Sequence, residues 1–171
     1  MADRFYMACL RDTVGSNMSF HCRNGQGYAS DINNAHVYTL EEAQNSWNRG
    51  RDIDLPVSAD AIDGAAVWHV DHQHIPGESV LEEGCERYAA FVKDRWNGND
   101  VYWLSDLLPT DDFSKARVFA QPDTTDSDLV WLPFTTADAV KRRTFNINLL
   151  DRRTMIQGAG LRQPDWFKRQ K

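Results

Sequence analysis

The sequence lacks the long apolar runs and the glycine- or proline-rich stretches that are typical of membrane and disordered proteins. No apolar stretch approaches the roughly 20 residues that a membrane-spanning helix requires. Gly and Pro number only 10 and 6 of 171 residues, while 42% of the residues are hydrophobic and 11% are aromatic. This composition is sufficient to fill a core, and the length corresponds to one ordinary domain or two small ones.

Cysteine is scarce and scattered. Cys9, Cys22 and Cys85 are odd in number and contain no C-x-x-C pair, so they predict reduced thiols rather than a disulfide framework. The N-terminal residues MADRFYMACLRD carry charges where a signal peptide needs an apolar core. Both features predict a protein of the cytosol.

Lysine is absent from the first half of the chain. Residues 1–83 hold 5 Arg, no Lys and 13 Asp or Glu, a balance of −8. Residues 84–171 hold 14 Lys or Arg and 12 Asp or Glu, a balance of +2, and the last part, residues 141–171, holds 9 Lys or Arg and 2 Asp, a balance of +7. This asymmetry bears on partners, because an acidic surface attracts basic proteins and a basic segment attracts nucleic acid.

The two halves of the chain share a series of short matches in the same order. FYMACLRD at 5–12 matches RYAAFVKD at 87–94, and DINNAHVY at 31–38 matches DFSKARVF at 112–119. Three further segments of the second half, GNDVYW, LPFTTADAV and RTFNINLLD, match GSNMSF, LPVSADAI and VWHVDHQHI of the first half, in that order. Ordered matches at nearly constant spacing predict a tandem duplication. The alternative is two unrelated halves whose strands match only because strands favour the same residue types.

Each half carries strand and turn signals followed by short helix signals. Thr39 followed by Glu42 is a capping box, which predicts a helix start, and Ser58 is a second predicted N-cap. The second half replaces the capped helix by a predicted loop, QPDTTDSDL at 121–129. We therefore expect an α+β fold of two tandem, pseudo-repeated units, each with a few antiparallel strands and one or two short helices. Their expected ranges are residues 1–78, which are acidic, and residues 84–171, which are diverged and end in a basic tail.

The first half contains N-G-x-G-Y-x-x-D at residues 24–31, A-x-V-Y-T-x-E-E-A at 35–43 and H-V-D at 69–71. In these motifs it resembles a recurring group of short, uncharacterised proteins of bacteriophages and prophages, although Ala29 stands where their pattern has Ser or Thr. The resemblance implies an origin in a phage or mobile element, and hence action in the cytosol of a host cell. It implies no particular chemistry.

The segment VWHVDHQHIP holds the densest group of candidate metal ligands. If Val67–Ile75 is a strand, His69 and Asp71 lie on one face and His72 and His74 on the other, because neighbouring side chains of a strand point to opposite sides. Two ligands per face are fewer than the three or four that a protein zinc site uses. A metal-dependent hydrolase using His69 and Asp71 is therefore the third alternative. Because the sequence has no G-x-S-x-G and no phosphate loop, we expect no catalytic residues and no cofactor.

The basic C-terminal segment is the candidate nucleic-acid site. It combines cations that can contact phosphates with the rings of Trp166 and Phe167, on which bases can stack. The acidic remainder of the chain opposes such binding, and the segment could equally dock on the acidic half of its own or a neighbouring chain. The residues concerned are Arg142, Arg143, Arg152, Arg153, Lys168 and Arg169.

The many aromatic residues favour protein–protein interaction. Six Trp and five Tyr exceed what a small core needs, and exposed aromatics and Arg form interface hot spots. We therefore expect a non-enzymatic binding protein that inhibits a host machine by protein–protein contact, for example a CRISPR effector. A nucleic-acid-binding accessory protein is the alternative.

The expected partner is a host protein or a protein–nucleic-acid complex. Direct contact with nucleic acid and formation of a homo-oligomer are both compatible with the sequence, and no membrane is expected to take part. The candidate contact residues are Phe20, Arg23, Tyr28, Asp31, Trp68 and Trp103.

Overall fold

The structure, a computed structural model, describes residues 3–168, and it describes only the backbone of Phe167 and Lys168. The chain forms two compact units. Unit 1 contains the residues up to Ala66 together with those from Thr144 on, and unit 2 contains Val67–Arg143. The units differ from the ranges expected from the sequence, because residues 67–78 pack in unit 2 and the C-terminal segment returns to unit 1.

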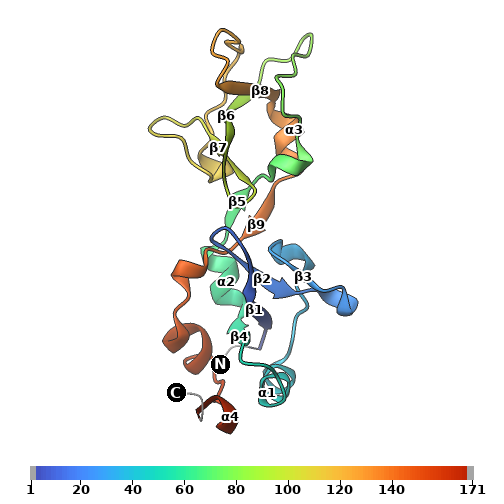
Figure 1. Cartoon of the computed structure of the whole chain (residues 1–171), viewed down its shortest axis with the longest axis vertical. Coiled ribbons are helices and arrows are strands. Elements are labelled where there is room, and N and C mark those ends of the chain that lie inside the picture. The colour runs from blue at the N-terminus through green and yellow to red at the C-terminus, as the bar shows by residue number, and fades with distance from the viewer. Residues whose placement is uncertain (1–2, 169–171) are drawn as a thin grey trace. The chain divides into compact units, whose positions relative to one another are not determined.

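Unit 1 is built on a four-stranded antiparallel sheet in the order β3-β2-β1-β4 (Figure 1). β1 (Phe5–Val14) and β2 (Asn17–His21) form a hairpin, β4 (Asp54–Ser58) pairs with the other edge of β1, and β3 (Tyr28–Ala29) pairs with β2. Every residue of β4 and the first five of β1 are buried. Both faces of this part of the sheet are therefore covered.

The predicted helix caps of unit 1 are confirmed. Thr39 Oγ1 accepts a hydrogen bond from the backbone of Glu42 at 3.2 Å, and Glu42 Oε1 accepts one from the backbone of Thr39 at 3.0 Å, which starts α1 (Leu40–Asn48). Ser58 Oγ accepts from the backbone of Ala61 at 3.3 Å and starts α2 (Ala59–Ala65). The other helical segments are η1 (Arg23–Gly25), η2 (Ile32–Asn34), η5 (Ile147–Leu149), η6 (Arg153–Gln157) and α4 (Asp165–Lys168).

The core of unit 1 takes side chains from both ends of the chain. The sheet and the first helices supply fully buried residues such as Phe5, Phe20 and Trp47. The C-terminal segment adds Phe145 and Ile156 to the same cluster. Because apolar burial is the main favourable term in folding, the C-terminal segment is part of the fold of unit 1.

Unit 2 is built on a three-stranded antiparallel sheet in the order β7-β6-β8. β6 (Tyr88–Asn97) pairs with β7 (Asp100–Trp103) and with β8 (Leu129–Pro133). The helical segments are η3 (His72–His74), η4 (Phe113–Lys115) and α3 (Phe134–Asp138). Two further strands, β5 (Val67–His69) and β9 (Arg142–Thr144), pair with each other.

The core of unit 2 includes residues that the sequence assigned to the first half. Val70 and Ile75 pack in one cluster with Val101, Trp103 and Leu132. The strand expected over Val67–Ile75 ends at His69. It ends there because the Asp71 side chain accepts a hydrogen bond from the backbone of Gln73 at 2.7 Å and caps η3.

Antiparallel sheets with a few short helices confirm the expected α+β class. The expected loop is also found, with no helix in it, but it ends at residue 128 because Leu129 begins β8. Within residues 3–168, none of the helices has the length and apolar character needed to cross a bilayer.

Candidate binding surfaces

Four aromatic side chains line a cavity of about 530 Å³ in unit 1. His21 ends β2 directly opposite Tyr28 of β3, with ring centroids 4.6 Å apart. The backbone N–H of His36 donates to the carbonyl of His21 at 3.0 Å, and the His36 ring lies 4.5 Å from that of Tyr38. We call this set of His21, Tyr28, His36 and Tyr38 the ring pocket.

A hydrogen-bonded network holds one side of the ring pocket in place. Arg51 donates to both carboxylate oxygens of Asp54 at 3.0 and 3.1 Å and to the hydroxyl of Tyr28 at 2.6 Å. Asp54 Oδ1 lies 2.9 Å from His21 Nε2. Burial alone would raise the pKa of Asp54, but hydrogen bonds from Arg51 and His21 outweigh it and lower that pKa. The network therefore favours the ionised carboxylate.

The turn that borders the ring pocket requires left-handed backbone. Gly25 and Gly27 have φ of 65° and 81°, and no atom lies within 4 Å of where a Cβ would stand. Glycine is therefore required by conformation and not by space. Cys22 lines the same cavity, and burial raises the pKa of its thiol, with a further contribution from Asp31. A raised pKa disfavours the thiolate, which is the form of cysteine that nucleophilic attack requires.

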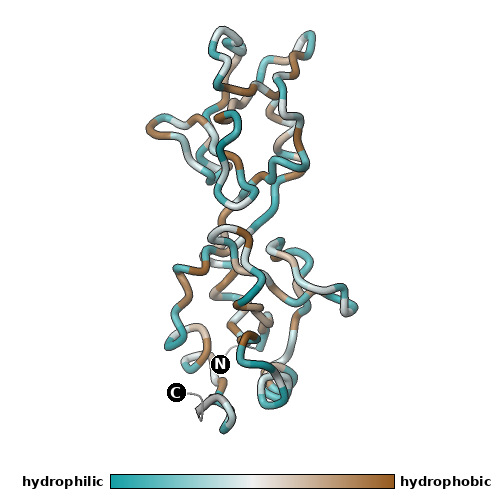
Figure 2. Tube along the Cα trace, viewed as in Figure 1, coloured by the Kyte–Doolittle hydropathy of each residue, from teal (hydrophilic) through white to brown (hydrophobic). Residues whose placement is uncertain are grey.

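Unit 2 displays two leucines on the loop that follows β7. Leu107 and Leu108 are 92% and 81% exposed. Figure 1 shows the loop projecting from the unit, and Figure 2 colours its tip as hydrophobic. We call residues 104–109 the leucine loop.

Hydrogen bonds fix the shape of the leucine loop. At its base, Trp103 and Thr110 bond each other's backbone at 2.7 and 2.9 Å. At its tip, Ser105 Oγ accepts from the backbone of Leu107 at 3.2 Å and donates to the carbonyl of Leu108 at 2.6 Å. The two leucines are thus held outside the core by a defined turn.

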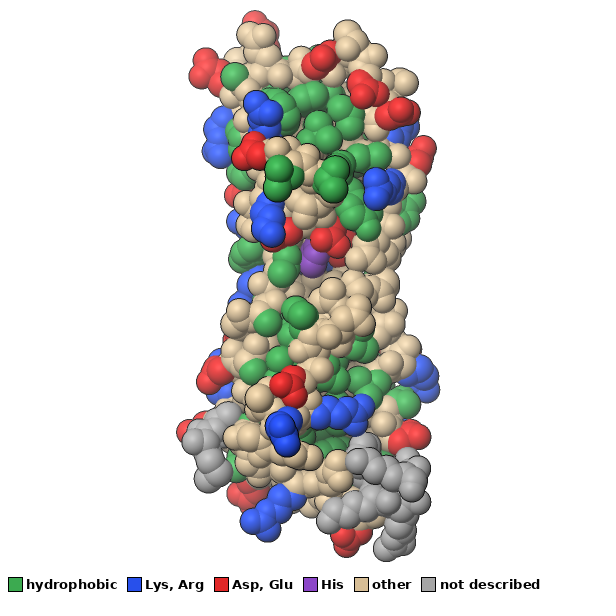
Figure 3. All heavy atoms as spheres, turned by 90° about the vertical axis from the view of Figure 1, so that its left-hand side faces the viewer, with side chains coloured by type: hydrophobic (Ala, Val, Ile, Leu, Met, Phe, Trp, Pro, Cys, Tyr) green, Lys and Arg blue, Asp and Glu red, His purple; other side chains and the backbone are tan. Residues whose placement is uncertain are grey.

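A shallow groove of about 460 Å³ lies beside the leucine loop. Val118, which is 41% exposed, adds to the apolar lining, and Arg117 lies 4.0 Å from Asp106 across the groove. Figure 3 views the molecule from the side toward which the loop projects, and hydrophobic side chains stand out there beside Lys and Arg. An apolar centre with a charged rim is the usual anatomy of a protein interface.

His69 and Asp71, the alternative metal pair, contact other groups. Asp71 caps η3, whereas His69 faces two other carboxylates, with Nδ1 3.9 Å from Asp100 and Nε2 3.6 Å from Asp111. The hydrogen bond from His69 lowers the pKa of Asp111, against burial and with help from Asn97. In the part of the chain that the structure describes, no group of three or more His, Cys, Asp or Glu could hold a metal ion.

The prediction that Phe20 and Trp103 contact a partner protein is wrong. Phe20 and Trp103 are fully buried in the cores of unit 1 and unit 2, so neither can touch a partner. Trp68 is half-buried, and the amino group of Lys141 lies 4.7 Å above its ring.

The other three expected contact residues lie in unit 1, and of these Tyr28 lines the ring pocket. Arg23 is exposed, Tyr28 lines the cavity, and the Asp31 side chain caps η2. Leu107 and Leu108 were not predicted as contact residues from the sequence. The sequence S-D-L-L-P, an apolar pair within a polar turn, is the pattern that indicates them.

The cations of the basic segment are divided between the two units. Arg142 lies in unit 2, where its guanidinium is 2.9 Å from the fully buried carboxylate of Asp100. Arg143 is half-buried in the same unit, while Arg152 and Arg153 are exposed in unit 1. The side chain of Lys168 and the whole of Arg169 lie outside the described residues. Arg142 is therefore not available for phosphate.

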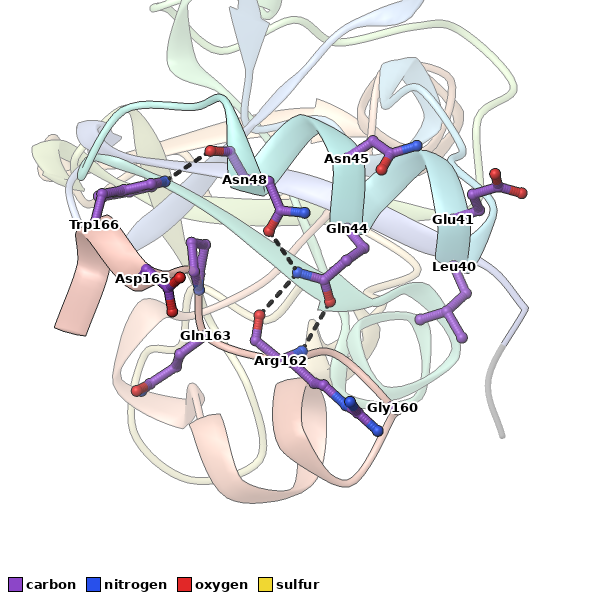
Figure 4. Close-up of a pocket in the computed structure, with 11 residues that line it drawn as sticks. Leu40, Glu41, Gln44, Asn45, Asn48, Gly160, Arg162, Gln163, Asp165 and Trp166 are labelled. Atoms are coloured by element: carbon purple, nitrogen blue, oxygen red, sulfur yellow. Dashed lines mark hydrogen bonds between the residues drawn. The ribbon is translucent and has the colours of Figure 1, made fainter.

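The C-terminal segment docks against α1 beside a cavity of 740 Å³ (Figure 4). The Gln44 side chain donates to the carbonyl of Arg162 and accepts from its N–H, both at 2.8 Å. Trp166 Nε1 donates to the carbonyl of Asn48 at 3.0 Å. Trp166 is thus folded back onto unit 1, where it packs against the core.

Comparison with models of known protein families, with curated proteins and with solved structures found no match for this chain.

Proposed function

We propose that the protein is a non-enzymatic binding protein whose leucine loop inserts into an apolar pocket of a partner protein. The observation that carries this proposal is the exposure of Leu107 and Leu108, at 92% and 81%, in a loop fixed by its own hydrogen bonds. Burying one leucine side chain is worth about 1.5–3 kcal/mol. Because the loop is already ordered, little of that gain is lost in ordering it on binding.

The proposed partner is a host machine that grips nucleic acid, which the protein would inhibit by occupying its surface. Two observations from the sequence support this choice. Residues 24–71 resemble the pattern of the phage and prophage proteins, and residues 1–83 have a balance of −8. An acidic protein is electrostatically complementary to a basic nucleic-acid groove, and such complementarity speeds and directs association.

The test is affinity capture from a bacterial host lysate with tagged wild type and with the double variant Leu107→Asp, Leu108→Asp. We expect wild type to retain a host protein in stoichiometric amount after nuclease treatment, and the double variant to lose it. The matched control is Leu81→Asp, a substitution at another exposed leucine of unit 2, 58% exposed, which should leave capture unchanged. Equal capture by wild type and the double variant would contradict the proposal, and so would capture that nuclease abolishes.

A further inference from the structure

Each half of the chain begins with one β-hairpin. The two hairpins, β1–β2 and β6–β7, pair their strands in the same register. Adding 83 to each residue number of the first hairpin gives the second, and in both the register shifts between the two pairs. The pairs are Ala8–Phe20 and Val14–Asn17 in β1–β2, and Phe91–Trp103 and Asn97–Asp100 in β6–β7. A shared register that includes a shared irregularity is specific, because bulges are positioned features of a sheet.

The elements that follow the hairpins also correspond. Phe5 forms an isolated bridge with Tyr38, and Tyr88 forms one with Phe119. Asp31 and Asp112 each cap a helical turn by accepting a backbone hydrogen bond at 3.0 Å. The next strand then pairs with the first strand of the hairpin in matching positions. These pairs are Phe5–Ser58 and Val57–Tyr6 in unit 1, and Tyr88–Pro133 and Leu132–Ala89 in unit 2.

The last segment of each half makes the same contacts but in the other unit. In unit 2, Val101 donates to the carbonyl of Val70 at 3.1 Å. In unit 1, Met18 donates to the carbonyl of Phe145 at 2.9 Å. Met18 and Val101 differ by 83 in number and Val70 and Phe145 by 75, so the two bonds are equivalent. Yet Val70 follows the hairpin of unit 1 in the chain, and Phe145 follows that of unit 2.

The side chains around these two bonds correspond as well. Val70 and Phe145 are both fully buried, and each is followed by a capping residue, Asp71 or Asn146. Each capping residue forms a bridge with the turn of the hairpin that it packs on. The bridges are Asp71–Asp100 in unit 2 and Asn17–Asn146 in unit 1.

We infer that the chain is a tandem duplication whose halves have exchanged their terminal segments. Residues 67–75 of the first half complete unit 2, and residues 144–150 of the second half complete unit 1. The turn of each hairpin is thus a docking surface, and the partner that it fits is the strand-and-turn segment of a second copy. Such reciprocal exchange of identical elements is how two like chains form an intertwined dimer.

Charge favours exchange between unlike halves. Residues 1–83 have a balance of −8 and residues 84–171 a balance of +2. Two first halves would repel each other, whereas a first and a second half attract. The fused chain therefore satisfies both docking surfaces within one molecule.

Paired cysteines in the full-length chain test the exchange. The exchanged fold brings position 17 next to position 146, so Asn17→Cys with Asn146→Cys should form a disulfide that unreduced peptide mapping detects. An unexchanged duplication would instead bring position 17 next to position 71, the counterpart of 146. The matched control is therefore Asn17→Cys with Asp71→Cys, which should form no disulfide. A disulfide in the control and none in the first variant would overturn the inference.

Discussion

Asp54 shows how one carboxylate organises the ring pocket. It is buried in β4, yet it keeps its charge because Arg51 and His21 both bond to it. Arg51 also donates a hydrogen bond to the hydroxyl of Tyr28, whose ring lies opposite His21. A single acidic residue thus sets the positions of a strand edge and two rings.

Asp54→Asn should reveal this role through pH. The folded-state pKa of Asp54 lies below its ordinary value of about 3.9. Its stabilisation is therefore fully present above that value and is lost as pH falls through the lower folded-state pKa. Urea unfolding should show a larger difference between wild type and Asp54→Asn at pH 6 than at pH 3. Asp52→Asn, at an exposed neighbour, should show the same small effect at both pH values; a pH-independent effect of Asp54→Asn would contradict the account.

Arg142→Ala should strongly destabilise the protein. Asp100 is fully buried, and the substitution leaves its carboxylate without the cation at 2.9 Å. Removing one partner of a buried ion pair costs about 3–5 kcal/mol. Chemical unfolding should detect this loss, while the exposed Arg152→Ala should change stability by less than about 0.5 kcal/mol. Equal effects of the two substitutions would show that Arg142 is not a structural cation.

At the scale of elements, caps were predictable and edge strands were not. Thr39, Glu42 and Ser58 mark helix starts through local hydrogen bonds, which a sequence reveals directly. β4 was missed because it contains Pro56. Proline is tolerated there because β4 lies at the edge of its sheet, where a missing N–H breaks no ladder.

Gln44→Ala should loosen the C-terminal segment from α1. The substitution removes both hydrogen bonds to the backbone of Arg162, including the one that protects its N–H. Deuterium uptake at residues 160–166 should therefore rise in hydrogen-exchange mass spectrometry. Asn45→Ala, one position along the same helix, should leave that uptake unchanged. Equal uptake in wild type and Gln44→Ala would show that Gln44 does not hold the C-terminal segment on α1.

At the scale of the whole molecule, the sequence indicated a repeat but not the exchange of its ends. Several matches were also out of register. Phe5 corresponds in its pairing to Tyr88 rather than Arg87, and residues 67–75 correspond to 142–150 rather than 143–151. An alignment of short strands by residue type can be displaced by one residue. The backbone hydrogen bonds define the correct alignment. Which unit a segment completes is a tertiary property, and no local pattern encodes it.

The candidate surfaces were predictable only in part for the same reason. Tyr28 and Arg23 could be named from their glycine turn, but the partners of Tyr28, Arg51 and His21, lie on other strands or loops. Phe20 and Trp103 looked like contact residues because an aromatic residue on a strand points inward or outward according to register alone.

The measurement that tests the exchanged fold most directly is the mass of the protein after one cut at Gly77. This glycine is exposed, and nothing lies within 4 Å of its missing Cβ, so an inserted protease site should be accepted there. Because each unit then contains both fragments, light scattering should give the intact mass of about 19.6 kDa in native buffer, with separation only in denaturant. Fragments that separate in native buffer would show that each half keeps its own end.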